Sequence, residues 1–516
     1  MAPIHTATDR NGSSNGSGNA ATRRRASLNE TTPLLAAGDF APTADPEIAE
    51  ATTNNTHDYD SEDEDGASAD KPLPVGQILA LCYARWVEPV AFFCIFPYIN
   101  KMAQENGHLA DTDVGFYSGL IESLFSLTQM TVMIMWGRAA DRFGRKPVLV
   151  LSLVGVTCAT SMFGMATTIW QMVLFRCLAG VFGGVIVTIR TMISEHSTSK
   201  TQARAFSWFA FSGNMGILFG PLIGGALADP AGQYPGLFGG VRFFEAYPYA
   251  LPSFAVGTIG VSAVVVTALF VDETLVRKDV SSVLPSLSTW DLLKSPGVSL
   301  VLYVYGHVML LAQSYTAIVT VVWFTRVDLG GFGFSPLQIS ILMGLNGLAQ
   351  AIWILLVFPP LQHRIGTNGV IRACGVAYPF FFLICPLLNM LLRGGTPGLV
   401  TAFWVLAPTL LCIGCGVSMS FTAVQLALNE VSPSPAVLGT LNAVALSITS
   451  GMRAFSPALF TSLFAVGART QALWGYAIWV VMVAIAVGFA VVSRYMPDYA
   501  ELKKQRRAVR AGQGAD

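Results

Sequence analysis

From Gly76 onward the chain is a succession of apolar stretches, each long enough to cross a lipid bilayer, separated by short polar loops. A helix needs about 20 mostly apolar residues to span the hydrocarbon core of a membrane. By this criterion about twelve stretches are predicted to span: 76–97, 114–136, 147–166, 169–190, 205–228, 249–271, 297–323, 337–358, 370–392, 400–428, 436–465 and 471–493. The sequence therefore predicts an all-α membrane protein with twelve transmembrane helices.

The composition of the chain supports a membrane protein whose surface faces lipid, and it excludes several classes of function. Of the 516 residues 53% are hydrophobic and only 12% are charged, whereas about 25% of the residues of a soluble domain are charged. The formal net charge of +0 gives no indication of a nucleic-acid partner. The eight cysteines include no CxxC pair with a matching second pair, so we expect neither a disulfide framework nor a structural zinc site.

The domain organisation follows from changes in composition along the chain. The first 70 residues are rich in Ser, Thr, Asn, Asp and Glu, which cannot bury enough apolar surface to order a chain, and they contain no apolar core of a signal peptide. The longest connection between stretches separates two sets of six. We therefore predict a disordered cytosolic tail (1–71), a first six-helix half (72–272), a central cytosolic loop (273–296), a second half (297–495) and a cytosolic C-terminal tail (496–516).

Lys and Arg in short loops predict the orientation. They gather after the second stretch and in the C-terminal tail, whereas the loop between the third and fourth stretches carries no charge. Positively charged loops stay in the cytosol. Both termini of this multi-pass protein are thus expected to be cytosolic, in a vacuolar or plasma membrane.

The N-terminal tail carries two short motifs for protein partners. The segment 30–35 (ETTPLL) fits an acidic dileucine signal, which vesicle-coat adaptors read. Arg23, Arg24 and Arg25 precede Ser27 and fit the site of a basophilic kinase, whose product would carry about two negative charges.

The loop after the second stretch has a recognisable sequence. Trp136 to Pro147 (WGRAADRFGRKP) resembles the signature loop of the major facilitator superfamily. The resemblance implies two pseudo-symmetric six-helix halves that transport a solute by alternating access, with this loop as a conformational latch. A charged loop is also, more simply, a signal for orientation. The latch residues are Gly137, Asp141, Arg142, Gly144, Arg145 and Lys146.

Two further stretches resemble motifs of the same superfamily. Leu174 to Gly184 (LFRCLAGVFGG) places Arg176 inside an apolar stretch, where the matching arginine of the family is associated with proton coupling. Gly216 to Gly225 (GILFGPLIGG) resembles the motif of the antiporter branch, which implies export rather than uptake. The antiporter motif comprises Gly216, Gly220, Pro221, Gly224 and Gly225.

The resemblance narrows to the drug:proton antiporter branch. The latch loop, Ser207 and the segment 272–275 (DETL) are similar to the zinc-induced facilitator-like group. Two features of that group are missing. Val276 and Arg277 follow the DETL segment in place of the histidines of the group, and its paired-cysteine motif near the first span is absent. We place the chain as a relative of that group.

Charged residues inside the stretches are candidates for proton coupling, because they are costly in a membrane and usually functional. Arg85 and Glu88 lie three residues apart on one helical face, so either they neutralise each other or Glu88 is a protonatable carboxylate. Glu122 is the second candidate acid, unless it is a helix-end residue that faces water. Arg453 must face protein or water, and a carboxylate of another helix is one candidate partner for it. The candidates are Glu88, Glu122, Arg85, Arg176 and Arg453.

Polar residues in the remaining stretches together predict a polar-lined cavity, although each of them alone is better explained as a helix–helix contact than as a ligand contact. They are Gln129, Asn214, His307, Asn346, Gln350, Gln425 and Asn442. No Walker loop, no cluster of metal ligands and no nucleophile–base motif is found, so no enzyme and no cofactor is predicted.

Together these features predict a secondary transporter, a proton-coupled antiporter that exports or sequesters a small organic solute. The expected partners are the solute, protons and the lipid bilayer. An uptake facilitator or symporter of the same fold is one alternative, and a membrane receptor that has lost transport is another.

Overall fold

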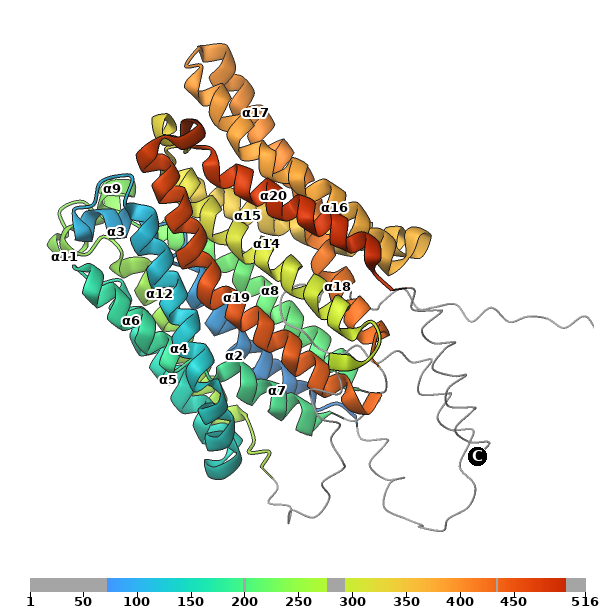
Figure 1. The fold of residues 1–516 in the computed structure, drawn as a ribbon. Helices are drawn as coiled ribbons and strands as arrows, with labels where there is room; N and C mark the ends of the chain where they lie inside the picture. Colours follow the sequence, from blue (N-terminus) through green and yellow to red (C-terminus); the bar gives the residue numbers. More distant parts are fainter. Residues whose placement is uncertain (1–71, 198–200, 276–292, 433–434, 498–516) are drawn as a thin grey trace, which may run out of the picture. The chain divides into compact units, whose positions relative to one another are not determined.

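The computed structural model describes residues 72–197, 201–275, 293–432 and 435–497, and these ranges form helices without a strand. The predicted tails and most of the central loop, with the dileucine and kinase motifs, lie outside the described residues. Figure 1 shows two sets of helices side by side, one blue to green and one yellow to red. The predicted all-α membrane fold is confirmed.

The first set of helices is the N-terminal half. It comprises α2 (Val75–Phe93), α3 (Ile99–Gly107), α4 (Val114–Phe143), α5 (Arg145–Phe163), α6 (Ile169–Val181), α7 (Val185–His196), α8 (Gln202–Leu227), the short α9 (Pro230–Gln233), α10 (Pro235–Phe238) and α11 (Arg242–Ala246), and α12 (Ala250–Phe270).

The second set is the C-terminal half. It comprises α14 (Val298–Phe324), η1 (Val327–Leu329), α15 (Pro336–Ile352), the π-helical η2 (Trp353–Val357), α16 (Phe358–Arg393), α17 (Pro397–Gly414), η3 (Cys415–Ser418), α18 (Met419–Glu430), α19 (Pro435–Thr470), η4 (Ala472–Gly475), α20 (Ala477–Val492) and η5 (Ser493–Tyr495).

The helices agree with the predicted spans. Nine segments of the described ranges are long and apolar enough to cross a membrane. One of them, Pro336–Arg393, is 58 residues long and turns at Gly366, whose φ of 73° interrupts the helix, so it holds two predicted spans. The remaining two spans are α2 and α19, which carry charged residues at their centres. The prediction of twelve spans is consistent with this arrangement.

Two predicted spans are interrupted helices. The stretch 169–190 is broken at Phe182–Gly184, and the stretch 400–428 narrows to a 3-10 turn at Cys415–Ser418. Glycines at both breaks lie against aromatic rings: a Cβ at Gly184 would meet Trp136, and a Cβ at Gly416 would meet Trp353. Hydropathy does not detect such breaks, because glycine interrupts a helix without making it polar.

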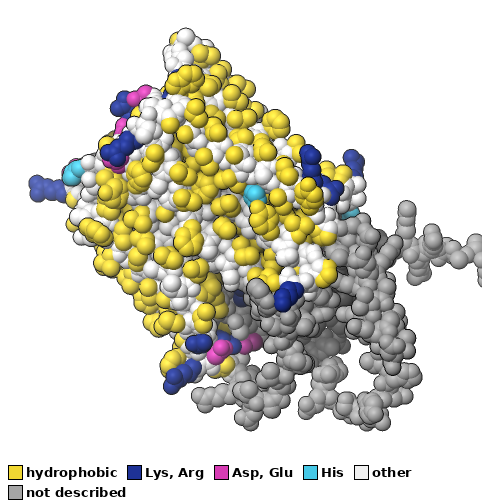
Figure 2. Space-filling view, viewed as in Figure 1, with side chains coloured by type: hydrophobic (Ala, Val, Ile, Leu, Met, Phe, Trp, Pro, Cys, Tyr) yellow, Lys and Arg dark blue, Asp and Glu magenta, His cyan; other side chains and the backbone are white. Residues whose placement is uncertain are grey.

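The outer surface is apolar between two charged ends. On the face in Figure 2, hydrophobic side chains cover the middle of the molecule and charged side chains gather toward its ends. Large apolar residues are strongly exposed, among them Ile134 (67%), Leu269 (70%) and Phe380 (68%). A soluble protein rarely exposes so much contiguous apolar surface, whereas a lipid-facing surface requires it.

Each half has a core of its own. The C-terminal half packs around fully buried Trp323, Phe382 and Trp479. The N-terminal half packs around two clusters, one that contains Phe163 and one that contains Phe209. Apart from Met343 of α15, which packs against the cluster that contains Phe163, each core consists of side chains of its own half, so each half can move largely as a unit.

The halves meet along two helix pairs, α4 with α19 and α8 with α15. In the first pair Gly119 lies directly against Thr461, and the Ala458 N–H donates to Ser123 Oγ at 2.8 Å. In the second pair Gly225 lies against Ser340. Small residues at these positions allow the helix backbones to approach closely.

The glycine contacts near Gly119 and Gly225 lie at one end of the bundle, which we call the closed end. There two ion pairs cross between the halves, Asp111–Arg326 at 3.7 Å and Asp113–Arg469 at 3.9 Å. Their arginines are exposed, and exposed pairs contribute about 0–1 kcal/mol each. The close packing of small residues is therefore the larger contribution to closure.

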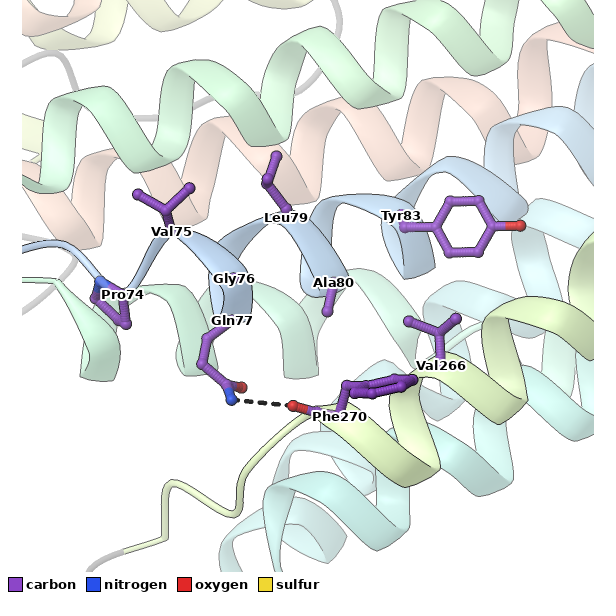
Figure 3. A pocket seen from close by; sticks show the side chains of 9 residues that line it. All are labelled: Pro74, Val75, Gly76, Gln77, Leu79, Ala80, Tyr83, Val266 and Phe270. Carbon is purple, nitrogen blue, oxygen red and sulfur yellow. Dashed lines mark hydrogen bonds between the residues drawn. The ribbon is translucent and has the colours of Figure 1, made fainter.

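At the opposite end, which we call the latch end, α2 begins where α12 finishes (Figure 3). Gln77 joins them: its Nε2 donates to Phe270 O at 3.0 Å and to Asp272 Oδ2 at 2.7 Å, and its Oε1 accepts from the Asp272 N–H at 3.0 Å. The shallow groove between the two helices is lined mostly by apolar residues of the N-terminal half, such as Leu79 and Val266. Since this joint lies within one half, it helps that half to move as one body.

Candidate functional site

A cavity of about 300 Å³ lies between the two halves. Its wall is mostly aromatic and aliphatic, and a few polar groups converge on it, which is the usual composition of a site for a small organic molecule. The charged and amide side chains that line it are Arg85, Glu88, Glu122 and Gln129 from the N-terminal half, and Gln313, Asn346, Gln350 and Arg453 from the C-terminal half.

Glu88 is held by two neighbours. Its carboxylate lies 3.7 Å from Arg85 Nη1, one turn earlier on α2, and it is 7% exposed. Gln129 of α4 donates from Nε2 to Glu88 Oε1 at 2.5 Å and to the Gly183 carbonyl at 3.0 Å. The structure thus places Arg85 and Glu88 together, and it adds a hydrogen bond from another helix.

Glu122 is a buried carboxylate of the cavity wall and not a helix-end residue that faces water, because it is only 1% exposed. Among the described residues no group donates a hydrogen bond to its Oε1. Its electrostatic neighbour is Arg176 of α6. A carboxylate with so few donors in a dry interior is well suited to bind and release a proton.

Two arginines share one aromatic ring. Arg176 lies 5.1 Å and Arg453 lies 4.8 Å from the centroid of Phe92, which lines the cavity. Both distances are within the range of a cation–π interaction. In the part of the chain that the structure describes, Arg453 makes no ion pair. Its guanidinium rests on an aromatic face, and its electrostatic neighbour is Glu88, a carboxylate of another helix.

Arg190 of α7 was not predicted as a site residue. Its guanidinium lies 5.5 Å from the ring of Phe209, over which Arg85 also lies at 5.2 Å. Glu88 is among its electrostatic neighbours. The predicted span ends at residue 190, whereas the helix continues to His196.

The predicted cavity residues divide into two groups. Gln129, Asn346 and Gln350 line the cavity, whereas Asn214, His307, Gln425 and Asn442 do not. The His307 ring nitrogen Nε2 pairs with the Ile485 carbonyl of α20 at 3.0 Å, and Gln425 donates to Asn442 at 3.0 Å. For His307, Gln425 and Asn442 these bonds favour the helix–helix alternative, because each side chain bonds to a neighbouring helix.

The antiporter motif brings α8 close to α2. Gly216 and Gly220 face α2 at one-turn spacing, where a Cβ would lie 2.7 Å from Pro89 Cβ and 3.0 Å from Phe93 Cβ respectively. Gly224 follows one turn later against the Cys94 carbonyl. Pro221 lines the cavity, and Gly225 faces α15 of the other half. The motif thus lies at both a packing surface and the cavity wall.

In the described structure the side chains of the latch contact the N-terminal half. Arg145 pairs with Asp141 one turn away and with Glu195 of α7 at 3.3 Å. Arg142 lies over the ring of Phe143, and Gly137 lies near Val187 of α7. Gly144 has a φ of 111°, a backbone conformation that glycine adopts without strain.

A carboxylate outside the predicted latch completes it. Glu273 accepts the backbone N–H groups of Arg145 at 2.8 Å and Lys146 at 3.1 Å, at the N-terminus of α5. Burial alone would raise the pKa of the Glu273 carboxyl, but the backbone donors outweigh it and lower that pKa. The carboxylate therefore acts as a cap for the first turn of α5.

Replacement of the Glu273 cap is expected to lower the stability of the protein in a way that depends on pH. We expect Glu273→Gln to lower the free energy of unfolding of the N-terminal half by about 0.5 kcal/mol, the low end for a lost cap, since Glu273 is exposed. Because the pKa of Glu273 is lower in the folded state, its contribution is complete above the unfolded value near pH 4.3 and is lost as the pH falls below it. Thermal unfolding in detergent at pH 7 and pH 4 measures this. A difference from wild type that grows toward pH 4 would contradict it.

No three His, Cys, Asp or Glu side chains of the described residues gather into a potential metal site. The cavity therefore offers protonatable carboxylates, guanidinium groups and aromatic surfaces. Groups of these kinds are able to bind an organic solute and to carry a proton.

Comparison with known proteins decides the family. Residues 81–457 match the Major Facilitator Superfamily. The chain belongs to the major facilitator superfamily. It is therefore a membrane transporter for small molecules, not an enzyme, as the resemblance of the latch loop implied.

Relatives and structures of the superfamily support this assignment. The chain is 46% identical to efflux pump azaK of Aspergillus niger over 83% of this chain and 89% of that protein. It is 27% identical to the protein ZINC INDUCED FACILITATOR-LIKE 1 of Arabidopsis thaliana, over 58% of this chain and 65% of the relative. A bacterial homologue of the human lysosomal transporter Spinster has the same fold, with a TM-score of 0.61 at 16% identity over 83% of this chain and 98% of that one.

Proposed function

We propose that this protein is a proton-coupled antiporter that exports or sequesters a small organic solute by alternating access. The observation that carries the proposal is the cavity between the halves, with Glu88 and Glu122 buried in its wall and an arginine near each. A carboxylate that faces the same cavity as the solute lets proton and solute act on one conformational equilibrium, which coupling requires.

In the proposed cycle, protonation of Glu122 or Glu88 weakens the attraction to its arginine and favours one state of the carrier. Release of that proton on the other side, with solute bound in the cavity, favours the reverse movement. For Glu122 the partner is Arg176, which rests on Phe92 in the cavity wall. A change in the charge of Glu122 therefore changes the attraction on Arg176, which contacts a ring that lines the solute site.

The proposed orientation has the latch end in the cytosol, with both termini, in a vacuolar or plasma membrane. The contacts of Gly119 and Gly225 then close the non-cytosolic end. In this orientation the described conformation faces inward, with the latch residues bound within their own half and to Glu273 directly after it. The latch would act in the opposite, outward-facing state.

Two findings support export over uptake. The relative from Aspergillus niger is named an efflux pump, and the antiporter motif packs α8 against α2 next to the cavity. Both are consistent with a solute that leaves the cytosol in exchange for a proton.

A flux experiment tests the proposal. The purified full chain is placed in sealed vesicles with an acidic interior, and a panel of cationic drugs, organic acids and metal chelates is added outside. We expect accumulation of one compound class that collapses when a protonophore removes the gradient. Equilibration that ignores the gradient would establish a facilitator instead.

A further inference from the structure

The charges inside the bundle do not balance. Four guanidinium groups and two carboxylates lie in the cavity or against the aromatic rings next to it, which leaves two positive charges in excess. They are Arg85, Arg176, Arg190, Arg453, Glu88 and Glu122. Arginine does not lose its proton in proteins, so the excess persists at any pH that the membrane meets. Protonation of either carboxylate increases it.

The excess has no counter-charge elsewhere in the described interior. Among the described residues, Glu88 is the carboxylate that neighbours Arg85, Arg190 and Arg453, and Arg190 also neighbours the hydroxyl of Tyr305. Buried charge without a partner is expensive in a membrane, and such groups usually belong to the path of a substrate or an ion. The cavity is therefore prepared for a negative group that the protein itself does not supply.

Arg453 is the arginine best placed to receive that group. It lines the cavity from α19 of the C-terminal half, and it is half-buried. In the described ranges it makes a cation–π contact with Phe92 but no hydrogen bond and no ion pair. Its guanidinium donors thus remain available for two parallel hydrogen bonds to a carboxylate or sulfonate.

The rest of the wall indicates what the negative group is attached to. Aromatic and thioether side chains contribute a large apolar part of the cavity wall: Phe92, Phe93, Phe96, Met309, Tyr315 and Phe381. An apolar ring system packs on such surfaces, and its charged end is left to the arginines. A cation of the same shape would meet the same surfaces and an added positive charge.

We infer that the solute is an amphipathic organic anion, with an aromatic or other apolar body and one acidic group that Arg453 binds. This inference rests on the proposed function and names its substrate class. Because Arg453 belongs to the C-terminal half and Phe92 to the N-terminal half, a solute whose acidic group binds Arg453 and whose apolar body packs on Phe92 contacts both moving units.

The test uses three probes with one ring system: naphthalene-2-sulfonate, the neutral naphthalene-2-sulfonamide and the permanent cation 2-naphthylmethyl-trimethylammonium. Binding to the purified full chain and counterflow in vesicles are both measured. We expect the sulfonate to bind and exchange, at least tenfold better than the other two. Arg453→Gln should lower sulfonate affinity at least tenfold, and Arg453→Lys should restore part of it.

Arg372→Gln is the matched control, since Arg372 bonds to the Ser493 and Arg494 carbonyls outside the cavity and should leave sulfonate binding unchanged. Preferential binding of the cation, or sulfonate binding that ignores Arg453, would overturn the inference while the antiporter proposal stands. Sulfonate binding that depends on Arg453 without any exchange would support the inference and remove the antiporter proposal.

Discussion

Glu122→Gln is expected to abolish solute accumulation driven by a pH gradient while solute exchange without a gradient continues. Glu122 is 1% exposed in the cavity wall, and glutamine has nearly the same shape but cannot carry a proton. Without a protonatable group the two states no longer respond to pH, although the cavity and its aromatic wall remain. We expect at least a tenfold loss of gradient-driven uptake in vesicles, with counterflow within about twofold of wild type.

Glu105→Gln is the control for this substitution. Glu105 lies on α3, where it accepts from Tyr249 Oη at 2.5 Å and lies 3.7 Å from Lys101, away from the cavity. The substitution Glu105→Gln removes the same negative charge as Glu122→Gln, but outside the proposed proton site, so gradient-driven uptake should persist. Full gradient-driven activity in Glu122→Gln would exclude this residue and leave Glu88 as the candidate acid.

Gly119→Val is expected to hold the halves apart at the closed end and to stop transport. A Cβ at Gly119 would lie 2.7 Å from the Pro457 carbonyl and 3.0 Å from Thr461 Cβ, both on α19 of the other half. Forcing extra carbon into such a contact costs about 1–3 kcal/mol. A penalty of about 3 kcal/mol on one state lowers its population about 100-fold.

Spin labels at Asp111 and Arg326, which pair across the closed end at 3.7 Å, measure this change. We expect a longer label distance in Gly119→Val, with counterflow reduced at least tenfold. Gly76→Val is the matched control, because nothing lies within 4 Å of a Cβ at Gly76. An unchanged distance together with wild-type counterflow would show that closure at this end does not depend on the glycine contact.

Much of the fold was predictable because a bilayer imposes a simple rule on sequence. The spans 114–136 and 249–271 lie within or close to α4 and α12, since each needs only enough apolar residues to cross the membrane. Breaks inside spans were not predictable in this way. Phe182–Gly184 and Cys415–Ser418 depend on rings from other helices, and hydropathy contains no information about those neighbours.

The site was predictable in its residue types but not in its pairings. Glu88, Glu122 and Arg176 were conspicuous because ionisable groups are rare in spans. The contact of Arg453 with Phe92 joins residues far apart in the chain, and no spacing rule predicts it. The sequence does contain an indication of Arg190, because an arginine stands at the last residue of the predicted span 169–190. The end of a span is uncertain by several residues, so this position did not identify Arg190 as an interior residue.

Coupling between proton and solute is the central claim, and proton movement driven by solute tests it most directly. Vesicles that contain the protein and a trapped pH-sensitive dye, with the membrane potential clamped, receive the solute that gave counterflow, without an imposed pH gradient. An antiporter must release protons from the lumen as solute enters, so the luminal pH should rise in wild type and stay constant in Glu122→Gln. Solute entry with no change in luminal pH in wild type would contradict the account.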